Sequence, residues 1–184
     1  MKIVNLASGI ILPVIICFLL LLIKDFMGGF QFILIFALIV ILFNTNKLKY
    51  LISVSLLLSI LLSFLIFFLS ILISSIPFYL ITGAVDIVSR EAYSNFPENK
   101  FFISLSVGVI SPLLTVFGYT FLLDIKKDFL FNCIVILTIC ILFIIGMLGI
   151  YSNMINSLYL IWQPTVLLAL QLLIYKREIK VLLK

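Results

Sequence analysis

The side chains that could do chemistry are few, and their spacing joins none of them into a reaction centre. The chain has no histidine, three cysteines and seven acidic residues. A Ser-His triad and a histidine-ligated zinc site are therefore not expected. An intramembrane hydrolase needs a nucleophile with a base, or a metal with its ligands, and the serines of this chain have no base beside them. We expect no catalytic, metal-binding or cofactor-binding residue, and we expect that the protein is not an enzyme.

The ionisable groups and the thiols lie in different parts of the sequence. The acidic residues all fall outside the long apolar runs, and so do the basic residues; the acidic ones are Asp25, Asp86, Glu91, Glu98, Asp124, Asp128 and Glu178. Proton-coupled transporters, voltage sensors and most ion pumps place ionisable groups inside the membrane, so the sequence argues against these classes. The cysteines, at positions 17, 133 and 140, lie within apolar runs and are interpreted as packing residues rather than disulfide partners.

Small and hydroxyl-bearing residues recur at helical spacing along two of the apolar runs. The first set falls within roughly a 100° arc of one helix face, and the second within roughly 80°. Small residues allow helices to approach closely, and hydroxyl groups can bond across the contact. The two stripes are candidates for helix packing, and the alternative is that they line a pore. They comprise Ser55, Ser59, Ser63, Ser70 and Ser74, and then Ser104, Gly108, Ser111, Thr115 and Gly118.

Two further groups of residues could contact other helices, lipids or proteins. Gln163 and Gln171 lie within about 80° of each other on the last apolar run, next to Pro164. A carboxamide in hydrocarbon needs a hydrogen-bonding partner, so we expect both to be buried and bonded to other helices. The basic tail is a candidate contact for lipid headgroups or for a partner protein. It comprises Lys176, Arg177, Lys180 and Lys184.

The elements that hold these residues are apolar and indicate an all-α polytopic membrane protein. Hydrophobic residues make up 65% of the chain and charged residues 10%, with a mean hydropathy of +1.44. A soluble domain carries about 25% charged residues, and a bilayer core requires roughly 20 apolar residues per helix. We predict a single transmembrane domain over residues 1–184 with about six spans, at about 3–23, 26–43, 50–74, 102–123, 129–150 and 157–175.

The third span is longer than one bilayer crossing requires. No charge occurs between Lys49 and Asp86, which leaves 36 uncharged residues in one run. Pro77, which follows Ser74 and Ser75 closely, offers a break. Three alternatives are open for residues 50–85: one long bent helix, a helix followed by an interfacial segment, or a hairpin of two short spans.

The basic residues orient the spans. With six spans and an N-terminus inside, nine of the 12 basic residues face the cytoplasm and three face outward. Splitting the third span into two reverses the bias, to five inside against seven outside. The positive-inside rule therefore predicts six spans with both termini in the cytoplasm and an outward loop near residues 85–101.

The sequence is compatible with three functions. The first is a non-catalytic multi-pass membrane subunit that assembles with itself or with a partner protein, as an anchor, sensor or gate in a cell-envelope, toxin-immunity or phage-defence system. The second is a transporter or substrate-binding membrane subunit for a small neutral solute, and the third is an oligomeric pore. The size and span count are similar to those of the substrate-binding components of energy-coupling-factor vitamin transporters and of the rod-shape membrane protein of the elongation machinery, but no diagnostic motif of either is matched.

The expected partners are membrane lipids together with a second copy of the chain or another protein, and no direct nucleic acid binding is expected. The chain is rich in Ile, Phe, Asn and Lys. This amino-acid composition is typical of an AT-rich gene. It favours a bacterial source and a location in the bacterial cytoplasmic membrane, that is, a cell inner membrane.

Overall fold

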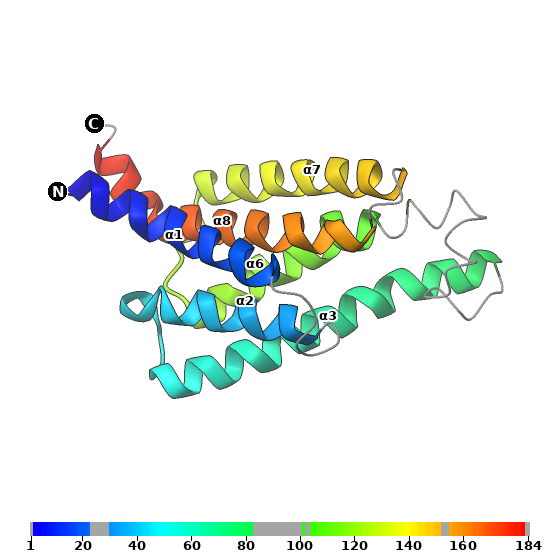
Figure 1. Cartoon of the computed structure of the whole chain (residues 1–184), viewed down its shortest axis with the longest axis horizontal. Coiled ribbons are helices and arrows are strands. Elements are labelled where there is room, and N and C mark those ends of the chain that lie inside the picture. The colour runs from blue at the N-terminus through cyan, green and yellow to red at the C-terminus, as the bar shows by residue number, and fades with distance from the viewer. Residues whose placement is uncertain (1, 23–29, 83–100, 102–103, 152–154, 183–184) are drawn as a thin grey trace.

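The computed structural model describes residues 2–22, 30–82, 101, 104–151 and 155–182, which fold mainly into helices (Figure 1). The α-helices are α1 (Lys2–Leu22), α2 (Phe30–Leu42), α3 (Ile52–Thr82), α6 (Ser111–Leu122), α7 (Phe129–Tyr151) and α8 (Ile155–Leu182). A π-helix, η2 (Ser106–Ile110), leads directly into α6, and a 3₁₀ turn, η1 (Thr45–Lys47), follows α2. Each predicted apolar segment corresponds to one of these helices, and the all-helical class is confirmed.

Two of the helices are long and apolar enough to cross a membrane. The qualifying stretches are Ile52–Ser70 of α3 and Phe129–Leu148 of α7. Shorter apolar helical stretches run over Leu6–Leu22, Ile33–Leu42 and Ser106–Leu122. By length and composition, therefore, the described residues contain two candidate membrane-crossing helices.

Helix α3 is one continuous helix of 31 residues. At 1.5 Å per residue it is about 46 Å long, and Figure 1 shows its later turns extending beyond the end of α7. The helix continues past Pro77 to Thr82, so the hairpin alternative does not form within these residues. The expected outward loop near residues 85–101 lies outside the described residues, apart from Phe101.

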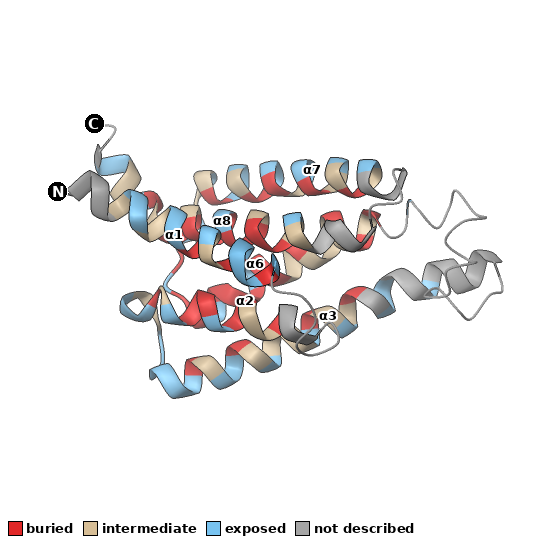
Figure 2. Cartoon of the chain, in the orientation of Figure 1, coloured by how far each residue is buried: buried red, intermediate tan, exposed pale blue. Residues whose placement is uncertain are grey.

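Helix α8 lies at the centre of the bundle. It packs along α1 and α7 and also contacts α2 and α6, whereas α3 packs on α2 and α6. Between Val166 and Ile174, α8 is mostly buried (Figure 2). The outer surfaces of α3 and α7 are instead formed by exposed apolar side chains, among them Leu57, Leu61, Leu65, Leu137 and Ile144.

The start of α1 and the end of α8 lie at the same end of the bundle (Figure 1). Helix α1 runs antiparallel to α8, and a Cβ atom placed on Gly9 would lie 3.2 Å from the ring of Tyr175. The α2–α3 and α6–α7 connections also meet at this end. The N–H of Lys49 donates to the carbonyl of Leu122 at 3.0 Å, and the N–H of Asp124 donates to a carbonyl of the other connection at 2.9 Å.

The π-helix η2 leaves one backbone carbonyl without a backbone donor. The N–H of Ser111 donates to the carbonyl of Ser106, five residues earlier. In the same register the carbonyl of Val107 would accept from residue 112, but Pro112 has no N–H. The indole Nε1 of Trp162 donates to the Val107 carbonyl instead, at 2.7 Å. A side chain of α8 thereby completes the backbone bonding of η2.

The same π-helix meets α7 at close range. Gly108 is buried, and a Cβ atom placed on it would lie 2.5 Å from the Cα of Phe143. One turn further along α7, a Cβ atom placed on Gly146 would lie 3.4 Å from the Cα of Ser104. At Gly108 only a glycine allows the two helix backbones to approach so closely, whereas a Cβ atom at Gly146 would make an ordinary van der Waals contact.

Replacing Trp162 by Phe removes the donor to the Val107 carbonyl. We expect the free energy of unfolding to fall by about 1 kcal/mol, the lower end of the cost of leaving a carbonyl without a partner, because this bond is only partly buried. In a Pro112→Ala background the backbone regains an N–H for this carbonyl, so Trp162→Phe should cost less there. A double-mutant cycle of unfolding free energies in mild detergent measures the difference. Equal costs in the two backgrounds would contradict this explanation.

Candidate functional site

All the charged side chains that the structure describes lie at the end of the bundle where α1 starts and α8 ends. They come from the α2–α3 connection, the α6–α7 connection and the last turns of α8. Leu48 and Leu123 pair in an antiparallel bridge that holds the two connections together. We refer to this set as the charged end: Lys47, Lys49, Asp124, Lys126, Lys127, Asp128, Lys176, Arg177, Glu178 and Lys180.

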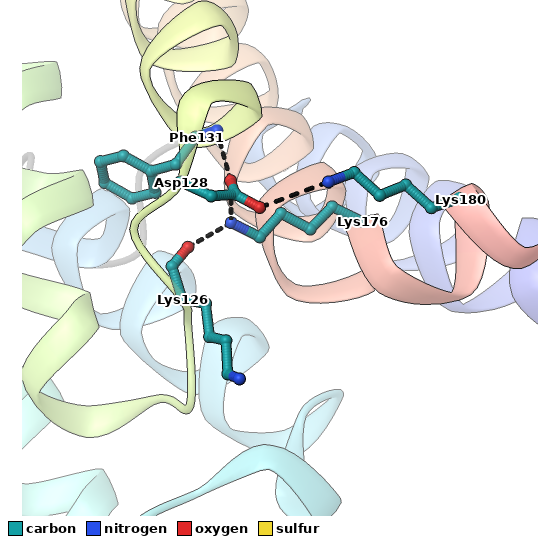
Figure 3. Close-up of polar contacts among 5 residues, drawn as sticks. All are labelled: Lys126, Asp128, Phe131, Lys176 and Lys180. Atoms are coloured by element: carbon teal, nitrogen blue, oxygen red, sulfur yellow. Dashed lines mark hydrogen bonds and ion pairs between the residues drawn. The ribbon is translucent and has the colours of Figure 1, made fainter.

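Asp128 links α7 to α8 (Figure 3). Its Oδ1 accepts the N–H of Phe131 at 3.0 Å, which caps the first turn of α7. The same oxygen lies 2.7 Å from the Nζ of Lys176, and Oδ2 lies 3.5 Å from the Nζ of Lys180. The hydrogen bond from Lys176, followed by that from the Phe131 N–H, lowers the pKa of Asp128 to about 2.

Lys176 is the buried member of this cluster, with a side chain only 4% exposed. Its ammonium group also donates to the backbone carbonyl of Lys126. A buried ammonium is tolerated only when its charge and its donors are satisfied, and here a carboxylate and a carbonyl share that role. Removal of Asp128 would leave Lys176 buried without its counter-charge.

A second ion pair ties α8 to the α2–α3 connection. The Nζ of Lys47 lies 2.7 Å from Oε1 of Glu178, and it also lies 5.9 Å from the centroid of the Tyr175 ring. Burial raises the pKa of Glu178, but the hydrogen bond and the positive charge of Lys47 outweigh it and lower that pKa overall. The last turns of α8 are therefore joined to both connections.

The first small-residue stripe meets a buried tyrosine of α6. The hydroxyl of Tyr119 lies 2.7 Å from the Oγ of Ser59 and 3.0 Å from the Oγ of Ser63. Ser59 also donates to the carbonyl of Ala37 on α2, at 3.3 Å. The ring of Phe36 packs edge-on against Tyr119, with 5.8 Å between the ring centroids. One phenol hydroxyl thus joins α3 to α6 beside α2.

Two further serines of α3 donate to backbone carbonyls. Ser55 and Ser70 are buried and donate to carbonyls of their own segment, at 3.3 and 2.7 Å. The carbonyl of Ser70 in turn accepts the hydroxyl of Ser106 from η2 at 2.8 Å. The side chain of Ser74 lies outside the described part of the chain.

The second stripe faces two different neighbours. Gly108 approaches α7, whereas a Cβ atom placed on Gly118 would lie 2.9 Å from Cδ1 of Leu62 on α3. Thr115 is buried and donates to the carbonyl of Ser111, one turn earlier, at 2.7 Å. The segment therefore places its small residues at contacts with both α3 and α7.

The two glutamines of α8 are buried. Gln171 is 0% exposed, and neither its amide nitrogen nor its carbonyl oxygen has a hydrogen-bond partner in the part of the chain that the structure describes. The expected bond from Gln171 to another helix is therefore not formed among these residues.

The basic tail divides into an inward and an outward part. Lys176 points inward at Asp128, whereas Arg177 and Lys180 are exposed. Lys184 lies outside the described residues. No cluster of cysteine and acidic side chains within the described ranges is arranged to hold a metal ion.

Several of these contacts were not predicted from the sequence. Asp128 stands directly before α7 and belongs to a residue type favoured at helix N-caps, so its capping role was visible in the sequence. Tyr119 carries an O–H group that requires a partner when buried, but nothing in the sequence indicated which residues would supply it. The hydrogen-bond partners of Lys176 and Trp162 are residues about 50 positions away along the chain, so spacing within one helix could not indicate them.

The Asp128 cluster predicts a loss of stability in acid. The pKa of Asp128 is about 2 in the folded chain against an ordinary value of 3.8. Its contribution is therefore fully present above about pH 4 and is lost as the pH falls towards 2. Thermal unfolding midpoints in mild detergent between pH 2 and 6 should show this decline. In Asp128→Asn the unfolding midpoint should be lower at pH 6, and the part of the decline due to Asp128 should disappear. A variant with the same pH profile as the wild-type chain would show that Asp128 does not cause the decline.

The chain matches no family model, no curated protein and no solved structure. A function for it therefore has to follow from its own residues and their arrangement.

Proposed function

We propose that the protein is a multi-pass membrane protein with six spans and both termini in the cytoplasm, and that it acts as a non-catalytic membrane subunit that assembles with itself or with a partner protein. The observation that carries this proposal is the separation of charge from apolar surface. The described charged side chains lie at one end of the bundle, and the outer faces of α3 and α7 are apolar. In water such a surface would be a large exposed apolar patch, whereas in a bilayer it would face lipid tails.

The arrangement of the chain ends and connections supports the orientation. Six antiparallel spans bring the two termini, the α2–α3 connection and the α6–α7 connection to one side of a membrane. These are the segments that hold nine of the 12 basic residues. The ion pairs Lys47–Glu178 and Lys176–Asp128 join three of these segments directly. By the positive-inside rule this side is cytoplasmic.

The contacts of the polar groups support a non-catalytic role. The hydroxyls of Ser59 and Ser63 lie against a tyrosine hydroxyl, not against a base. The carboxylates of Asp128 and Glu178 are paired with lysines. Groups that could serve as nucleophile, acid or base are thus held in contacts between helices. The same contacts weaken the oligomeric pore alternative, because its wall would need the serine stripe to be free.

For assembly, the apolar face of α3 is the surface that we favour. Its exposed residues repeat at spacings of 4, 4, 3 and 4, which keeps them on one face of the helix. Such spacing is typical of a helix that packs along another helix. The opposite, serine-bearing face is already occupied by α2 and α6, so a partner helix would meet the apolar face. Its members are Leu57, Leu61, Leu65, Phe68 and Leu72.

Native mass spectrometry from mild detergent tests the proposal. We expect a complex that contains more than one copy of the chain, or one copy with another protein. Truncating the α3 face in Leu61→Ala/Leu65→Ala should shift the distribution towards the single chain. The matched control is Ile136→Ala/Leu137→Ala on the exposed face of α7, which should leave the complex intact. A wild-type chain that is always a lone monomer would overturn the assembly role.

A second candidate function, a substrate-binding membrane subunit for a small neutral solute, is favoured by one observation. The carboxamide of Gln171 is buried and has no partner among the described residues. A carboxamide offers both a donor and an acceptor, which suits a neutral solute that carries polar groups.

Gln171→Leu separates these candidates. Without solute, the substitution removes a buried polar group that is unpaired among the described residues, and should raise the free energy of unfolding by about 1–2 kcal/mol. If the second candidate holds, a vitamin or metabolite should raise the unfolding midpoint of the wild-type chain and have no effect on Gln171→Leu. A panel of such solutes that shifts neither protein would count against solute binding. A strongly destabilised Gln171→Leu would show that the carboxamide has a partner in the membrane.

A further inference from the structure

The charged end carries a surplus of positive charge that its own carboxylates do not neutralise. Among the described side chains there are seven basic and three acidic residues, and two of the acidic ones are held in the ion pairs given above. Lys126, Lys127 and Arg177 are exposed and form no ion pair within the described part of the chain. Figure 3 shows the side chain of Lys126 pointing away from Asp128.

Two cations of the charged end, Lys127 and Lys49, are held in place by contacts with neutral groups. The Nζ of Lys127 lies 5.0 Å from the centroid of the Phe117 ring. The Nζ of Lys49 donates to the carbonyl of Thr120 at 2.6 Å. These contacts fix the side-chain stems against the bundle and leave the positive charge without a counter-charge among the described side chains. An anion from outside would complete the arrangement.

Three of the four most exposed apolar side chains of the described chain stand within two positions of a lysine of the charged end. Four large apolar residues are at least 70% exposed, and they are Leu51, Phe121, Phe129 and Val181. Phe129 follows Lys127 by two positions, Val181 follows Lys180, and Leu51 follows Lys49 by two. At a membrane surface such apolar side chains enter the acyl region while neighbouring lysine and arginine side chains extend to the phosphates.

We propose that the charged end binds the headgroups of anionic phospholipids, with Lys126, Lys127 and Arg177 as the phosphate contacts and Phe129 among the acyl chains. This inference rests on the proposed membrane insertion and adds the class of lipid that the protein selects. A soluble protein with an acidic surface is the less suitable occupant, because it would leave these exposed apolar side chains in water. Lys176 takes no part, since its ammonium is engaged with Asp128 inside the bundle.

The test compares phosphatidylglycerol with phosphatidylcholine on the purified, delipidated chain in mild detergent. Native mass spectrometry gives the apparent affinity for each lipid, and we expect a preference for phosphatidylglycerol that inorganic phosphate does not compete away at equal concentration. In Lys126→Gln/Lys127→Gln/Arg177→Gln that affinity should fall about 100-fold, because each basic residue near a surface contributes about 1 kcal/mol. Affinity for phosphatidylcholine should stay the same.

The matched control is Lys24→Gln/Arg90→Gln/Lys100→Gln, which removes the same net charge from segments that the sequence predicts on the other side of the membrane. It should retain the preference for phosphatidylglycerol. Equal affinity for the two lipids, an equal loss in both variants, or loss of a co-purified protein rather than of lipid would overturn the inference. Carbonate extraction of membranes shows whether a negative result concerns only lipid selection or also membrane insertion. A chain that stays in the membrane without lipid preference refutes only the inference, whereas a chain released into the supernatant refutes membrane insertion itself.

Discussion

Backbone hydrogen bonds in the buried parts of this bundle must be completed within the chain, because a buried N–H or C=O group without a partner is costly. Helices meet this constraint along most of their length, and the constraint becomes visible where a helix departs from its regular pattern. In η2 the shift to π bonding and the missing N–H of Pro112 leave the Val107 carbonyl without a donor, and Trp162 supplies one. The central position of α8 is therefore set by polar contacts as well as by its buried leucines.

The charged end follows from the same constraint. Helix ends and connections carry backbone groups that need partners, and here two connections bond to each other through Lys47, Lys49, Leu122 and Asp124. Asp128 caps α7 and at the same time pairs with α8. A single carboxylate thus satisfies a helix end and neutralises a buried ammonium, which ties the last turns of α8 to the rest of the bundle.

The fold was largely predictable from the sequence, whereas the contacts between helices were not. Long apolar runs bounded by polar residues indicated the helices, and the uninterrupted run after Lys49 left three alternatives open, and α3 is one continuous helix. The serine spacing indicated a face of α3 that meets protein, and Ser55, Ser59 and Ser70 are buried. Spacing alone could not identify Tyr119 or Trp162 as partners, because such contacts depend on how helices distant in the sequence pack.

Membrane insertion is the central claim, and the thiol of Cys140 tests it most directly. Cys140 is exposed on α7, and a maleimide reacts with the thiolate, which requires water. In intact membranes from a Cys17→Ala/Cys133→Ala variant, a charged maleimide should leave Cys140 unlabelled until detergent denaturation. The same background with Cys140→Ala and Lys127→Cys, at the charged end, should be labelled from the cytoplasmic side. Labelling of Cys140 as fast as that of the thiol at position 127 would mean that α7 faces water, and would contradict a bilayer position for the bundle.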